Sequence, residues 1–93
     1  MVIHKQILDF VNNDVCSIRL PMDAEVLCCQ MQYNNTLCIW YKWSGAHNTK
    51  TVTRVFQIVG TGHNFSDNNK MQYISTVQID NGAFIFHVFE ITK

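Results

Sequence analysis

Short runs of alternating apolar and polar residues recur along the chain, and clusters of Asn, Asp, Gly and Pro separate them. The runs are rich in Val, Ile, Phe, Tyr and Thr, which favour strands. The pattern predicts about seven short strands: Ile3 to Phe10, Val15 to Leu20, Glu25 to Tyr33, Thr36 to Trp43, Thr51 to Val59, Gln72 to Ile79 and Ala83 to Ile91. We therefore expect a mainly β, single small antiparallel domain over residues 1–93, built as a sandwich or an open barrel.

Polar clusters predict the tight turns. Asn34-Asn35 lies between two alternating runs, and Asn tolerates the left-handed backbone conformation that a two-residue hairpin loop needs. Asp80-Asn81-Gly82 precedes the last run in the same way, and Asn12-Asn13-Asp14 joins the first two runs. One short helix stays open as an alternative for Val2 to Val11, because its apolar residues also recur at helical spacing.

Two runs indicate which faces are covered. The third run alternates as a half-buried strand does. Its apolar face is expected to hold Leu27, Cys29, Met31 and Tyr33, and its polar face Gln30 and Gln32. The last run, Ala83 to Ile91, is apolar at both alternate sets of positions. It is therefore expected to be a central strand covered on both sides, or a strand at a subunit interface.

Composition and charge narrow the class of protein. Hydrophobic residues make up 47% of the chain, enough for a packed core. Seven Lys and Arg balance seven Asp and Glu, so binding of nucleic acid by bulk electrostatics is not expected. The N-terminal residues lack a signal-peptide pattern, and no run approaches the roughly 20 apolar residues that span a bilayer. We expect a cytoplasmic protein without a membrane partner.

The cysteines and histidines give little sign of catalytic or metal chemistry. Cys16, Cys28, Cys29 and Cys38 contain no C-x-x-C pair, and adjacent residues on a strand point to opposite faces. The cysteines are expected to be reduced and buried as small hydrophobes. No two histidines have the spacing of a metal site. We expect no metal, no cofactor and no enzyme activity.

The stretch Gly60-Thr61-Gly62-His63 is the first candidate for ligand binding. Its glycines allow close backbone approach, and its amides and the His63 imidazole suit a phosphate or a carbonyl. The alternative is a plain turn between two strands. His87, in the apolar last run, is expected to be buried with one hydrogen-bond partner or to line a site.

A second candidate is the aromatic segment that ends the fourth run. Trp43 suits stacking on a nucleobase, with Lys42 or Arg54 holding a phosphate. The alternative is packing in the core or at an interface.

Three motifs carry a resemblance. They are G-T-G-H at residues 60–63, Y-I-S-T-V-Q at 73–78 and F-H-V-F-E at 86–90. Together they resemble a family of short uncharacterised bacteriophage proteins, which implies a phage origin and a host-cytoplasmic setting. Phage accessory proteins of this size often act by binding, although that is an analogy of size and origin.

Three functions follow as hypotheses. The first is a non-catalytic binding protein that forms a homo-oligomer and sequesters a nucleotide-type immune signal of the host. The second is an inhibitor or modulator of a host defence protein, which it would bind through a strand edge or an aromatic patch. The third is a small structural component of the virion.

Overall fold

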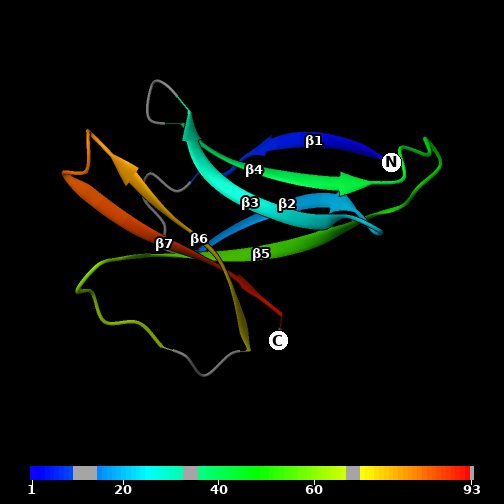
Figure 1. Cartoon of the computed structure of the whole chain (residues 1–93). Helices are drawn as coiled ribbons and strands as arrows, with labels where there is room; N and C mark the ends of the chain where they lie inside the picture. The colour runs from blue at the N-terminus through cyan, green and yellow to red at the C-terminus, as the bar shows by residue number, and fades with distance from the viewer. Residues whose placement is uncertain (10–14, 33–35, 67–69, 93) are drawn as a thin grey trace.

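The computed structural model describes residues 1–9, 15–32, 36–66 and 70–92 and contains seven strands (Figure 1). They are β1 Val2–Ile7, β2 Val15–Pro21, β3 Glu25–Gln32, β4 Thr36–Trp43, β5 Thr51–Gly60, β6 Met71–Ile79 and β7 Phe84–Ile91. The predicted strands are confirmed, and most of their ends shift by one residue or none. No helix occurs among the described residues, so the opening segment is a strand.

The strands form two sheets, shown as two layers in Figure 1. A three-stranded sheet has the order β1-β4-β3, and a four-stranded sheet has the order β2-β5-β7-β6. Every neighbouring pair is antiparallel. The predicted small antiparallel β domain is confirmed: its described strands form two sheets and do not close into a barrel.

The core lies between the two sheets. Its largest fully buried side chains include Ile39 of β4, Phe56 of β5 and Val88 of β7, each 0% exposed. Burial of such a side chain contributes roughly 1.5–3 kcal/mol, so alternation within these strands selects the inward face.

No helix in the described part of the chain is long and apolar enough to cross a membrane.

The last strand is central, as predicted, because β7 lies between β5 and β6. Phe86 and Val88 face the core, whereas His87 and Phe89 lie on the opposite, outer face. On that outer face Phe65 stacks on Phe89 and Val59 is 7% exposed, whereas Ile85 is 37% exposed. The apolar content of both faces thus marks a central strand whose outer side is covered in part.

A β-bulge corrects the prediction for the third run. The register between β3 and β4 shifts between Val26 and Cys28. An extra residue reverses the alternation, so Val26 packs against the core and Leu27 turns outward with 41% exposure. Cys29 and Met31 remain inward, and Cys28 and Cys29 face opposite sides as predicted. Tyr33 lies outside the described residues.

One predicted turn is confirmed by its backbone. Asp80 and Asn81 both have φ 55°, and Gly82 has φ 90°. Two consecutive left-handed residues are typical of the hairpin turns that match the twist of the flanking strands. Asn34-Asn35 and Asn12-Asn13-Asp14 lie outside the described residues.

Candidate functional site

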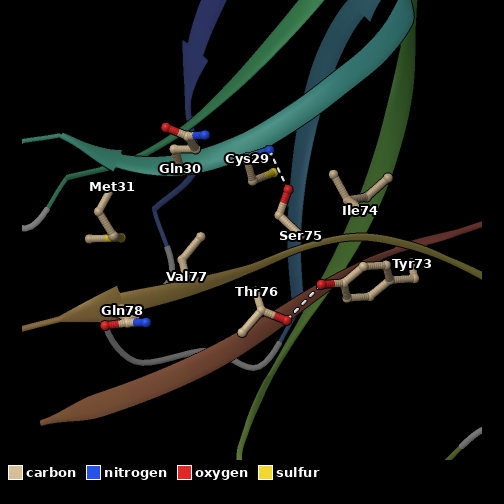
Figure 2. A pocket seen from close by; sticks show the side chains of 9 residues that line it. All are labelled: Cys29, Gln30, Met31, Tyr73, Ile74, Ser75, Thr76, Val77 and Gln78. Carbon is tan, nitrogen blue, oxygen red and sulfur yellow. Dashed lines mark hydrogen bonds between the residues drawn. The ribbon is translucent and has the colours of Figure 1, made fainter. Parts of the chain in front are cut away.

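The outer face of the four-stranded sheet gathers side chains that are far apart in the sequence. Tyr73 pairs with Phe89, and Thr76 pairs with His87, across β6 and β7. The register shifts between Tyr73 and Ser75. This bulge lets Tyr73 and Thr76, which regular alternation would place on opposite faces, point to the same face. The Tyr73 hydroxyl lies 2.6 Å from Thr76 Oγ1 (Figure 2).

A chain of polar groups crosses this face. Thr76 Oγ1 lies 3.0 Å from His87 Nδ1, and Thr61 Oγ1 lies 2.7 Å from His87 Nε2. Thr61 Oγ1 also donates to the Ile85 carbonyl oxygen at 3.3 Å. We name Thr61, His87, Thr76 and Tyr73 the polar chain.

The His87 tautomer sets the direction of these hydrogen bonds. A neutral imidazole donates at one ring nitrogen and accepts at the other, so His87 links Thr61 on one side to Thr76 and Tyr73 on the other. The hydroxyls can donate or accept, so the polar chain is consistent with either tautomer.

Three aromatic rings adjoin the polar chain, and we name Phe65, Tyr73 and Phe89 the aromatic cluster. Phe65 stacks on Phe89 with centroids 5.8 Å apart and an interplanar angle of 29°. Tyr73 meets Phe89 edge to face, also at 5.8 Å. Phe65 and Tyr73 remain 44% and 55% exposed. Exposed rings beside hydrogen-bonding groups suit a planar ligand that carries polar atoms.

The predicted glycine loop borders this face. The Thr61 amide donates to the Ile85 carbonyl at 3.1 Å, and the His63 amide donates to the Gly60 carbonyl at 3.0 Å. The His63 ring lies so close to Gly60 that a Cβ there would be 2.8 Å from Nδ1. Gly62 has φ 84°. The turn thus uses the His63 amide internally, bonds to β7 through the Thr61 amide, and contributes the Thr61 hydroxyl to the polar chain.

A hollow of about 230 Å³ lies between this loop and the start of β7. Gly60, Thr61 and His63 line one side, and Phe84 and Phe86 lie among the residues of the other side. The volume is below the roughly 300–1,000 Å³ typical of ligand pockets, so the hollow by itself offers little room for a ligand.

The other predicted residues lie elsewhere. Lys42 and Trp43 end β4 in the three-stranded sheet, where Lys42 forms an ion pair with Glu25 at 3.5 Å. Trp43 Nε1 donates to His4 Nδ1 at 3.2 Å. Lys42 and Trp43 lie near the start of β5. The glycine loop follows the end of this ten-residue strand, about 30 Å away. The structure therefore does not bring Lys42 and Trp43 to the glycine loop.

Arg54 points between the sheets. Its guanidinium forms a two-point ion pair with Glu90, whose exposure is 6%, and it donates to the Ala24 carbonyl at 3.0 Å. The hydrogen bond to Glu90 raises the pKa of Arg54. These donors are occupied inside the protein and are not presented to the candidate face.

Sequence reasoning missed Phe65, Tyr73, Thr76 and Phe89. Tyr73 and Thr76 lie in one of the resembling motifs, Y-I-S-T-V-Q, but the bulge that aligns them has no sequence signal of its own. Among the described residues, no three His, Cys, Asp or Glu side chains gather as a metal site.

Fold and face together define a small all-β domain of two packed sheets, one of which exposes aromatic and hydroxyl-bearing side chains. The family model described as Domain of unknown function (DUF7352) matches residues 1–93, and the chain belongs to that family. Neither a curated protein nor a solved structure matches the chain.

Proposed function

We propose that this protein is a non-catalytic binding protein that takes up a nucleotide-type small molecule on the outer face of the four-stranded sheet. The observation that carries the proposal is the contact between the exposed aromatic cluster and the polar chain, made through the Tyr73 hydroxyl and Thr76 Oγ1 at 2.6 Å. A base stacks on the exposed ring faces, and the hydroxyls and imidazole meet its polar edge.

The charge near this face indicates what kind of nucleotide fits. Lys70 precedes β6 and is exposed, and Arg19 lies farther along on β2, where it bonds Thr51 and Thr53. His63 is also exposed beside Thr61. So few cations favour a ligand with one or two phosphates over a polyphosphate or a long nucleic acid.

The proposal includes the setting that the motif resemblance implies. We place the protein in the cytoplasm of a phage-infected host, where capture of a nucleotide signal would counter a defence response. The outer face of the three-stranded sheet supports a homo-oligomer, because Ile3 is 62% exposed and Ile7 is 55% exposed there. Native mass spectrometry of protein purified from infected cells would report both the subunit number and any retained ligand mass.

Titration with nucleoside monophosphates and cyclic nucleotides tests the site itself. We expect micromolar binding by at least one of them and a loss of roughly 5- to 150-fold in affinity for Tyr73→Ala, since stacking contributes about 1–3 kcal/mol per base. Tyr73→Phe is the matched control, because it keeps the ring and removes the hydroxyl. If no nucleotide from the panel or from a host extract binds better than millimolar, the proposal is wrong.

A further inference from the structure

Two edge strands of different sheets lie side by side without a ladder between them. β3 ends the three-stranded sheet and β6 ends the four-stranded sheet. The Cys29 amide donates to Ser75 Oγ at 2.8 Å, which joins the two edges at one point (Figure 2). Figure 2 shows β3 and β6 running in the same direction and separating from this point toward Met31 and Gln78.

The hydrogen-bond pattern shows which backbone groups of β6 face the gap. The Thr92 amide, just after β7, donates to the Lys70 carbonyl, so the backbone groups of even-numbered residues along β7 bond toward β6. The Thr61 amide donates to the Ile85 carbonyl, so those of odd-numbered residues of β7 bond toward β5, which agrees with this alternation. Ser75 and Val77, opposite Val88 and Phe86, therefore bond to β7.

The residues between them have the opposite orientation. Backbone amides and carbonyls alternate sides along a strand, so those of Thr76 and Gln78 turn away from β7 and toward β3. No backbone partner for them is found among the described residues of β3. These two residues leave two donors and two acceptors on the open edge of β6.

The same reasoning applies to β3. The Leu8 amide donates to the Leu37 carbonyl, so Leu37 bonds toward β1 and its neighbour Cys38 bonds toward β3. Cys38 is opposite Gln30, which leaves Cys29 and Met31 facing the gap. The bond from the Cys29 amide to Ser75 agrees with this orientation.

The gap is a groove of about 490 Å³. Met31, Ile74 and Val77 also pack against the core cluster and form its apolar floor. Gln30, Thr76 and Gln78 border the groove, and Figure 2 shows their side chains turned away from the gap, so these residues present their backbone to it. Such a groove offers backbone hydrogen bonds at two edges and an apolar floor for alternate side chains of an extended segment.

We propose that this groove binds an extended polypeptide segment of a partner protein as an added β-strand. Because β3 and β6 run in the same direction, one segment can be antiparallel to both where they have separated beyond the Cys29–Ser75 bond. There it can bond to Met31 on one side and to Thr76 and Gln78 on the other. In the bound segment, apolar residues that contact Met31 and Val77 alternate with polar residues that face solvent. A second copy of this chain would offer its edge to one of the two strands and leave the other unpaired, so a partner segment fits better.

Amide hydrogen exchange of the free protein tests the geometry on which the proposal rests. We expect the amides of Met31, Thr76 and Gln78 to exchange at least tenfold faster than those of Ser75 and Val77, measured by NMR. Equal protection of all five amides would mean that the edges are already paired, and would overturn the proposal.

A displayed library of random decapeptides supplies the binding probe. We expect selected peptides of alternating apolar and polar residues that bind at or below about 100 µM and slow exchange at Met31, Thr76 and Gln78. Gln78→Pro removes one edge amide and leaves the ladder to β7 intact, so it should weaken binding at least tenfold. Gln78→Ala is the matched control, because it removes the side chain and keeps the amide, and its affinity should stay within threefold.

Three further outcomes overturn the proposal. One is that no decapeptide binds in this range. Another is that selected peptides bind Gln78→Pro, shown by NMR to be folded, as tightly as they bind Gln78→Ala. The third is that the edge amides become protected only as protein concentration rises, with a dimer in sedimentation, since the occupant is then a second copy.

Discussion

His87 and Glu90 lie on the same strand, and the two sides of β7 give them different surroundings. Glu90 points between the sheets, is 6% exposed and holds the Arg54 guanidinium at two points. His87 points outward and is only half-buried, and its partners are the hydroxyls of Thr61 and Thr76. One polar cluster is charged and enclosed, whereas the other joins an imidazole to hydroxyl groups and meets solvent.

The difference shows how polar groups in one small sheet divide between stability and binding. An enclosed carboxylate is expensive to bury unless it is paired, so the geometry of Arg54 and Glu90 is fixed by the fold. Hydroxyls both donate and accept and can rotate, so the polar chain can exchange its internal bonds for bonds to a ligand. Changes to the inner pair should therefore affect unfolding, and changes to the outer chain should affect ligand affinity.

The largest expected effect is the loss of the inner ion pair. Arg54→Ala leaves Glu90 enclosed without its cation, and we expect the free energy of unfolding to fall by about 3 kcal/mol, the lower end of the range for broken buried pairs because Arg54 is partly exposed. Urea unfolding followed by circular dichroism measures it.

Arg19→Ala is the matched control for this prediction. Arg19 also bonds across to β5, through Thr51 and Thr53, but on the outer face in solvent. We expect it to cost less than about 1 kcal/mol. If the two arginine variants lose the same stability, the contrast between the two sides of the sheet is wrong.

A smaller effect is expected from the outer chain. His87→Leu removes the imidazole and leaves Thr61 and Thr76 free to bond to water, so the free energy of unfolding should change by less than about 1 kcal/mol. Affinity for a nucleotide that binds wild type should fall about tenfold, the equivalent of one lost hydrogen bond. Calorimetry on wild type, His87→Leu and His87→Gln separates the two readouts, and a large loss of stability without a loss of affinity would make the chain structural.

Much of the fold follows from the residue pattern. Thr36–Trp43 was predicted with both its ends, and the left-handed pair Asp80 and Asn81 was predicted from composition. The two bulges, at Leu27 and near Ile74, were not predictable, because an extra residue in a ladder is decided by packing across the sheet. The prediction that Leu27 faces the core was therefore wrong.

The candidate face was only partly accessible to sequence reasoning. The glycine loop was recognised, and Thr61 within it does belong to the polar chain. Phe65, Tyr73 and Phe89 come from separate segments, and only strand register brings their rings together. Lys42, Trp43 and Arg54 had suitable side chains for a nucleotide, but residue type gives neither the sheet nor the side on which a residue lies.

Cys28 and Cys29 are adjacent residues of β3, of which Cys28 points outward and Cys29 points inward. Of the changes considered, those at these two residues should affect stability at neutral pH the least. Burial, followed by the nearby Cys28, Cys38 and Glu90, raises the pKa of Cys29 to about 12. A thiol whose folded-state pKa lies above the unfolded value of 9.0 contributes stability below about pH 9, and this contribution is lost as pH rises from about 9 to 12. In that window the free energy of unfolding falls by up to about 1.4 kcal/mol per pH unit.

Cys29→Ala should therefore flatten the alkaline loss of stability, measured by urea unfolding between pH 7 and 10.5. Iodoacetamide at pH 8 gives an independent readout, because Cys29 is 1% exposed and reacts only when the β3 edge opens. Peptide mapping should find Cys28 alkylated first. Equal rates at the two positions would show that β3 does not hold Cys29 inside, and the assignment of its open edge would fail with it.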